Sequence, residues 1–260
     1  MYISLFLIKT VGCYNKDTMN IRERTDMWDT FKNINHFRRA IRKFGTTPIP
    51  EEDVREVLAE ATLAPSSGNM HPYELHWVHD PDLKRQVAEA CNGQKAAATA
   101  ADLIVIVASP SIAKRTTKLW STYLEHTSTL SEDSKVYHRK QLKTFQRVIT
   151  VGSLALWSPF VFMSALIRPT LSLLPIGYIG SRQWDARSAI FAAQTILLAA
   201  AAKGIDSCPM EGFSASKIAS TLKLPRGSVV PIVIALGYRA DDARIEERWR
   251  RPIEDIVVSH

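Results

Sequence analysis

One helical segment in the second half of the chain limits how the protein can fold. Residues 186–203 have the length and composition of a helix, with apolar residues on every side and Gly204 as the stop signal. Such a helix offers no face to water, so it belongs in the middle of a core or in an interface. The chain has 260 residues, 46% of them hydrophobic, and can build a sizeable core around it. At about 150 residues per domain, this length predicts one large or two small domains.

Strands and helices are expected on either side of this segment. Residues 102–109 and 229–236 are continuous apolar runs of the kind found in buried strands. Further strands are predicted over 73–79, from 205 to 210, and over 253–258. Helices are predicted over 27–44, 50–61, 81–90 and 214–222, and residues 111–150 are helical in pattern. No repeat and no linker is found, so the division is an N-terminal extension, 1–26, and one domain, 27–260.

Charge and cysteine usage exclude several classes of protein. The net charge is +7, but no block of five or six like charges occurs, which argues against a nucleic-acid-binding arm. The arginines clustered near both ends of the domain instead indicate a site for a phosphate group. The three cysteines, Cys13, Cys91 and Cys208, form no CxxC or Cys/His pattern, so neither a disulfide framework nor a metal site is expected. Residues 1–8 are apolar without a preceding basic region, which disfavours a secretion signal. A reducing, cytoplasmic location fits best.

The excursion over residues 151–182 is unusually apolar. Residues 154–167 carry no charge, but a membrane span needs about 20 residues, and Pro159 interrupts this stretch. We interpret it as a buried helix pair or a cap over a pocket. A patch that contacts a membrane surface is the alternative.

Common catalytic signatures are missing from the sequence. It contains no GxSxG elbow, HExxH helix, Walker loop or GxGxxG turn. An enzyme without these sets would most easily take its reactivity from an organic cofactor.

Several short segments occur in an order that resembles the FMN-dependent nitroreductase family. They are RRAIRKF at 38–44, APSSGNMHPY at 64–73, PMEGF at 209–213, LGY at 236–238 and RWRRP at 248–252. The resemblance covers about residues 30–258. It implies an α+β fold with a central, mainly antiparallel sheet flanked by helices. It also implies a domain-swapped homodimer with two FMN sites at the interface, in which the strand 253–258 joins the sheet of the other subunit.

The resemblance further implies which residues contact FMN. The phosphate, a dianion suited to guanidinium donors, would lie among Arg38, Arg39, Arg248 and Arg250. Arg42 would stabilise negative charge near flavin N1, and Asn92 and Lys95 would face the pyrimidine edge. Ala40 stands where many family members have Ser, which removes one hydroxyl contact.

Two further segments complete the implied flavin site. The loop that reaches the flavin from the partner subunit would contribute Pro65, Ser66, Ser67 and Asn69. His71 stands where the family commonly has Gln. The turn whose main-chain N–H faces flavin N5 would be formed by Pro209, Met210, Glu211 and Gly212, and Gly212 lets the backbone approach closely.

The implied activity is a ping-pong reaction in which NADH or NADPH reduces FMN and a nitroaromatic, quinone or similar planar small molecule is then reduced. No catalytic side chain is assigned, because the flavin carries the chemistry. We expect Trp157, Phe160 and Phe162 to line the acceptor pocket, since aromatic rings stack on planar molecules. Two alternatives remain. One is a different flavin enzyme on the same scaffold, such as a dehydrogenase, a dehalogenase or a flavin-consuming oxidase. The other is a non-enzymatic, membrane-associated flavin-binding protein, with contact through 154–167.

Overall fold

The computed structural model describes residues 21–152 and 181–260, and the chain divides into two units after Phe37. The described part of the first unit is the helix α1, Ile21–Phe37. Trp28 and Phe31 stack on this helix with their ring centroids 5.8 Å apart, and both side chains are exposed. Arg38–His260 form the second unit, which contains the sheet.

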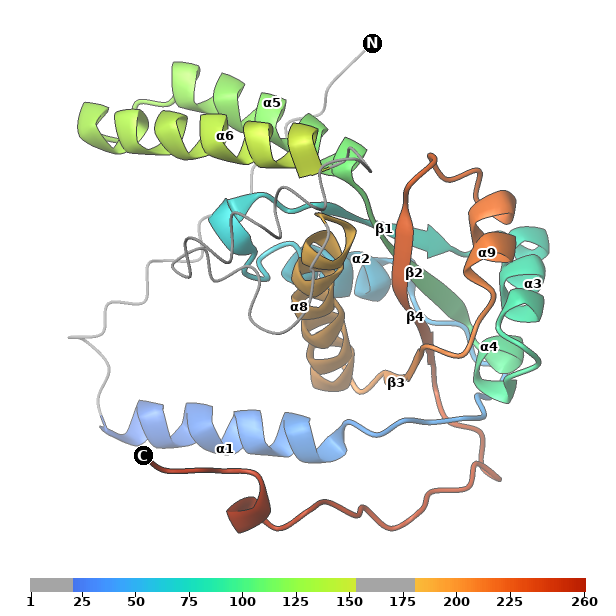
Figure 1. Cartoon of the computed structure of the whole chain (residues 1–260). Helices are drawn as coiled ribbons and strands as arrows, with labels where there is room; N and C mark the ends of the chain where they lie inside the picture. The colour runs from blue at the N-terminus through green and yellow to red at the C-terminus, as the bar shows by residue number, and fades with distance from the viewer. Residues whose placement is uncertain (1–20, 153–180) are drawn as a thin grey trace. The chain divides into compact units, whose positions relative to one another are not determined.

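A four-stranded antiparallel sheet forms the centre of the second unit (Figure 1). Its strands are β1 (Tyr73–Val78), β2 (Asp102–Ala108), β3 (Asp206–Met210) and β4 (Val229–Gly237), in the order β1-β2-β4-β3. Every residue of β2 is buried, and successive side chains enter opposite cores, as the two-residue period of a strand requires. This explains why β2 is apolar without alternation.

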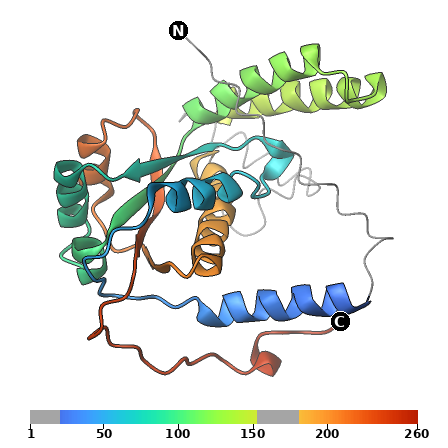
Figure 2. The same cartoon turned by 180° about the vertical axis from the view of Figure 1, so that it is seen from behind.

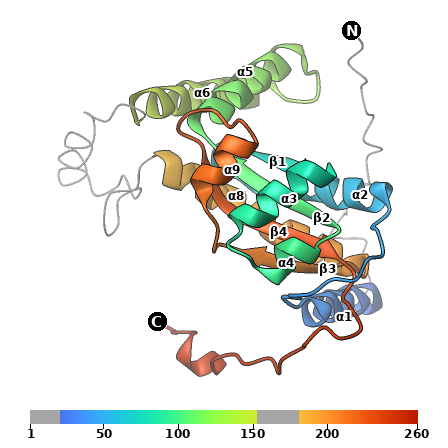
Figure 3. The same ribbon diagram turned by 90° about the vertical axis from the view of Figure 1, so that its right-hand side faces the viewer.

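Helices cover both faces of the sheet. Figure 3 shows α3 (Pro81–Ala90), α4 (Lys95–Thr99) and α9 (Ala215–Thr221) on one face. The other face carries α2 (Glu51–Ala61) and α8 (Ser181–Ala202). The helices α5 (Pro110–His126) and α6 (Glu132–Gly152) form a hairpin beyond the sheet, seen clearly from behind in Figure 2. The α+β fold is therefore as the sequence predicts. None of the helices that the structure describes combines the length and hydropathy that a membrane span requires.

The helix α8 has a buried side that packs in the core and another side with exposed apolar residues. Ala189, Ala192 and Ile196 are completely buried against the sheet. On another side of the same helix, Ile190 is 41% exposed and Phe191 is 56% exposed. The expectation that this helix lies in a core is confirmed for its buried side.

One secondary-structure prediction is wrong. The helix expected over 27–44 ends at Phe37, and the following segment is extended along the sheet. There Ala40 forms a bridge with Ser207, and the Ile41 main-chain N–H donates to the Ser207 carbonyl oxygen at 3.0 Å. Burial of Ile41 and Phe44 in the core holds the segment in this path.

The strand predicted at the C-terminus is one that would join the sheet of another subunit. The strand expected over 253–258 is not formed within this chain. Instead, Ile253–Asp255 form a short 3₁₀ helix, and Ile256, Val257 and Val258 are exposed. These apolar side chains have no buried face to occupy within their own subunit, which explains why the pattern does not become a strand here.

Candidate functional site

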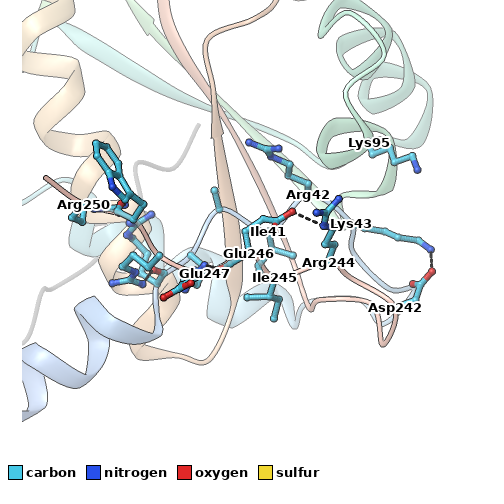
Figure 4. Close-up of a pocket in the computed structure, with 15 residues that line it drawn as sticks. Ile41, Arg42, Lys43, Lys95, Asp242, Arg244, Ile245, Glu246, Glu247 and Arg250 are labelled. Atoms are coloured by element: carbon cyan, nitrogen blue, oxygen red, sulfur yellow. Dashed lines mark hydrogen bonds and ion pairs between the residues drawn. The ribbon is translucent and has the colours of Figure 1, made fainter.

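Two segments from opposite ends of the second unit line one cavity of about 540 Å³ (Figure 4). The first is the extended segment 38–43, and the second runs from 242 to 250. Lys95, at the start of α4, completes the lining. The structure therefore brings together predicted residues from both ends of this unit and from α4, namely Arg38, Arg39, Ala40, Arg42, Lys95, Arg248 and Arg250.

Hydrogen bonds to main-chain atoms fix the two segments against each other. The Nη2 of Arg248 donates to the carbonyl oxygen of Arg38 at 2.7 Å. The Nη2 of Arg39 donates in the opposite sense, to the carbonyl oxygen of Glu246. Lys43 and Asp242 add an ion pair, which Figure 4 shows at one edge of the cavity. These reciprocal contacts set the positions of the arginines.

The cavity is strongly cationic. Eight basic side chains and three acidic ones line it. The acidic Asp242 and Glu246 pair with Lys43 and Arg244 at the rim. None of the ion pairs within the described part of the chain involves Arg38, Arg39, Arg42 or Arg250.

The arginines of the cavity repel one another. Burial lowers the pKa of Arg38, and the charges of Arg250 and Arg39 lower that pKa further. Burial likewise lowers the pKa of Arg248, with further contributions from Arg39, Arg250 and Arg38. Guanidinium groups of like charge that lie this close together form a site for a multivalent anion.

A separate turn follows β3 and is held by two amide side chains. The carbonyl oxygen of Gly212 accepts hydrogen bonds from Asn92 Nδ2 at 3.1 Å and from Gln94 Nε2 at 2.7 Å. A Cβ added to Gly212 would lie 3.3 Å from Gln94 Nε2, so glycine fits this position closely. Glu211 is exposed, and Pro209 and Met210 precede the turn in β3, where Met210 is buried.

Asn92 therefore orients the turn that contains Gly212. Gln94 was not predicted from the sequence. The sequence signal that could have indicated it is its place directly after Asn92 and Gly93.

The loop 65–71 does not join the arginines within one chain. None of the described residues that line the cavity comes from it. Its conformation is nevertheless closely held: the Ser66 hydroxyl accepts from the His71 main-chain N–H at 3.0 Å, and the Asn69 and His71 side chains are 2.8 Å apart, between Oδ1 and Nε2. Burial lowers the pKa of His71, which favours a neutral imidazole at pH 7.

Trp157, Phe160 and Phe162, the predicted acceptor-pocket residues, lie outside the described residues. The cavity also includes side chains that were not predicted, among them Lys43, Arg244 and Trp249. Lys43 and Trp249 lie within the RRAIRKF and RWRRP segments, so only their contribution to the lining was missed.

Comparison with known proteins gives consistent results. The model of the nitroreductase family matches residues 36–238. The chain is 27% identical to an NADH dehydrogenase of Thermus thermophilus, over 85% of this chain and 91% of the relative. It is 29% identical to the protein DrgA of Synechocystis, over 86% of this chain and 90% of the relative. A Bacillus subtilis protein assigned as an NAD(P)H nitroreductase, YfkO, is 26% identical, over 85% and 93% of the two chains.

Solved structures show the same fold. A nitroreductase family protein of Streptococcus pneumoniae superposes with a TM-score of 0.64 at 22% identity, covering 88% of this chain and 100% of that one. A protein of Exiguobacterium sibiricum, assigned as a nitroreductase and solved in complex with FMN, gives a TM-score of 0.66 at 21% identity. The coverage there is 88% of this chain and 97% of that chain.

Proposed function

Because the chain belongs to the nitroreductase family, we propose that it is an NAD(P)H-dependent oxidoreductase that binds FMN with the phosphate in the arginine cavity. The observation that carries this proposal is the convergence of Arg38 and Arg39 with Arg250 in one cavity. None of these three forms an ion pair with a carboxylate of the described residues. A phosphate dianion would supply the missing negative charge.

The donor chemistry of the cavity fits this group. Guanidinium side chains offer paired N–H donors that match phosphate oxygens, and charge-assisted hydrogen bonds of this kind are about twice as strong as neutral ones. After burial, the positive charges of neighbouring arginines also contribute to the lowered pKa values of Arg38 and Arg248. Binding of an anion relieves that repulsion.

Other residues are suited to hold the ring system. Arg42 and Lys95 line the same cavity and supply positive charge beside the flavin pyrimidine ring. Asn92 and Gln94 fix the Gly212 carbonyl oxygen and so hold the main chain of the turn that we propose to face flavin N5. When bound, FMN supplies hydride and electron transfer between NAD(P)H and the acceptor. The residues of this chain then act by placement and charge, and we assign no side-chain acid or base.

We propose that the active form is a homodimer. The family resemblance brings the loop 65–71 to the flavin from a second copy, and the described residues that line the cavity of this chain include none from that loop. Ile190 and Phe191 on α8 supply an exposed apolar surface for such an interface. The exposed apolar residues of 253–258 are suited to pair with β1. This strand is at the edge of the sheet, and its side away from β2 pairs with no strand that the structure describes.

The acceptor is proposed to be a planar, apolar molecule such as a nitroaromatic or a quinone, with Trp157, Phe160 and Phe162 beside it. The aromatic composition of the apolar stretch 154–167 supports this choice of acceptor. A different flavin enzyme on the same scaffold remains the second candidate, because fold does not fix chemistry. A cytoplasmic location stays a prediction from cysteine usage.

The visible spectrum of the purified protein tests this proposal. Protein saturated with FMN is expected to carry one flavin per subunit and to lose the oxidised-flavin band when NADH or NADPH is added without oxygen. Adding a quinone should restore the band. A flavin-loaded protein that neither nucleotide bleaches would overturn the oxidoreductase proposal, and the non-enzymatic flavin-binding alternative would replace it.

A further inference from the structure

The loop 65–71 has an unusual contact with the α5–α6 hairpin. Gly68 has φ +62°, in the left-handed region that favours glycine. A Cβ added to Gly68 would overlap the ring of Phe145, a residue of α6. The aromatic ring therefore lies directly on the glycine, in space that any side chain would need.

Phe145 is itself held in place from the other side. Its ring stacks on that of Trp184 in α8, with centroids 5.7 Å apart and planes inclined by 29°. Both rings pack on a small core that contains Met70 and Leu142. Met70, two residues after Gly68, is completely buried in this core. The loop is thus fixed at two positions by one aromatic cluster.

The loop needs such support because its backbone is strained. Asn69 has φ +56° and His71 has φ +38°, both in the left-handed region although neither residue is glycine. Residues in such conformations persist where surrounding contacts over-determine them. The internal hydrogen bonds of the loop, from His71 N–H to Ser66 Oγ and between the Asn69 and His71 side chains, are local and cannot fix the loop relative to the rest of the fold.

We infer that Phe145 is a positioning residue that holds the loop 65–71 in its strained conformation through contact with Gly68. The link from the loop to FMN rests on the proposed function. Under that proposal, the α5–α6 hairpin of one subunit positions the loop that completes the flavin site of its partner.

Hydrogen–deuterium exchange of the full-length protein, with and without added FMN, tests the packing relationship itself. The amides to follow are those of Asn69, Met70 and His71, which donate to Ser66 O, Ser67 O and Ser66 Oγ. In Phe145→Ala their exchange should be about two- to tenfold faster, the range expected for losing one aromatic pair. Phe145→Leu, which keeps an apolar side chain on Gly68, should lie between Phe145→Ala and the native protein.

Tyr137→Ala is the matched control, because Tyr137 is an exposed aromatic residue of the same helix whose ring contacts His138. It should leave loop exchange unchanged. Equal acceleration in Tyr137→Ala and Phe145→Ala would mean that the hairpin merely loosens as a whole, and unchanged exchange in Phe145→Ala would mean that the ring does not hold the loop. Either result overturns the inference.

A double-mutant cycle with Gly68→Ala gives an independent test. In the native background, the new methyl group collides with the Phe145 ring and should speed loop exchange. In the Phe145→Ala background that collision is gone, so the same substitution should have a smaller effect. Equal effects in both backgrounds would contradict direct contact.

FMN titration of the same variants separates the two proposals. If Phe145→Ala speeds loop exchange and also weakens FMN binding about two- to tenfold, both stand. If exchange changes while FMN affinity does not, the positioning role stands and the assignment of this loop to the flavin fails.

Discussion

Arg248 donates a hydrogen bond from its guanidinium group to the main-chain carbonyl oxygen of Arg38, 210 positions earlier in the sequence, at 2.7 Å. Arg39 donates back to the carbonyl oxygen of Glu246. The arginines therefore do more than supply charge, because they also join the first and last segments of the unit that contains the sheet. Replacing Arg248 or Arg39 would therefore change both the charge of the cavity and the contact between the two segments, so neither variant would test anion binding alone.

Arg250 is the better choice, because its Nη1 donates to the carbonyl oxygen of its neighbour Trp249 and not to the other segment. Arg250→Ala should weaken FMN binding by about 1.5–3 kcal/mol, the usual contribution of a hydrogen bond to a charged group. Isothermal titration with FMN measures this. Arg85→Ala, which removes an exposed arginine of α3, is the control. A folded Arg250→Ala protein with native FMN affinity would remove Arg250 from the phosphate site.

Asp206 and Arg239 tie the start of β3 to the end of β4. The buried carboxylate of Asp206 accepts from the Arg239 main-chain N–H and Nε, both at 2.9 Å, and from Nη2 at 2.6 Å. Arg239→Ala leaves this carboxylate without its cationic partner and should lower the free energy of unfolding by about 3–5 kcal/mol. Urea denaturation measures the loss, and Arg239→Lys should recover part of it. A loss below about 1 kcal/mol would show that the pair behaves like an exposed one.

The buried Asp185 on α8 predicts a pH-dependent loss of stability. Neither carboxylate oxygen has a hydrogen-bond partner among the described residues, and burial raises the pKa of Asp185 to about 7. The unfolded value is about 3.9, so the folded state favours the protonated form and becomes less stable as the pH rises from about 4 to about 7. Asp185→Asn removes this dependence.

Denaturation at pH 5 and pH 8 measures the difference. Between these values the native protein should lose about 2–3 kcal/mol relative to Asp185→Asn, at about 1.4 kcal/mol per pH unit. Parallel pH profiles for the two proteins would show that Asp185 does not titrate in this range.

The exposed C-terminal segment predicts a truncation effect. Deleting residues 253–260 should reduce dimerisation and flavin retention together, because the proposed site is completed by a second copy. Light scattering and the ratio of flavin to protein absorbance measure the two properties. A truncated protein that remains dimeric and retains FMN would exclude a role for this segment in assembly.

The buried strands could be predicted closely because their signal is local. The runs 102–109 and 229–236 are apolar on both faces, and β2 and β4 occupy almost the same residues. The helix end at Phe37 was missed because Phe37, Ile41 and Phe44 continue a helical spacing. What ends the helix is pairing with Ser207 and Arg239, which no local pattern reveals.

In the candidate site too, local sequence patterns could be predicted and contacts between distant segments could not. The family prediction is confirmed, and the arginines predicted from both ends of the sequence do meet in one cavity. Gln94 was missed because its partner, Gly212, lies 118 residues later. The apolar pattern of 253–258 could indicate a strand, but it could not specify which subunit would provide the neighbouring strand.

Comparing FMN with riboflavin tests the central claim most directly, because the two differ only in the phosphate. Titration of the flavin-free, full-length protein should give an affinity for FMN at least about tenfold higher than for riboflavin, since one charge-assisted hydrogen bond to the phosphate already contributes about 1.5–3 kcal/mol. This preference should shrink in Arg250→Ala and persist in Arg85→Ala. Equal affinity of the native protein for FMN and riboflavin, or no binding of FMN at all, would contradict the assignment of the arginine cavity to the flavin phosphate.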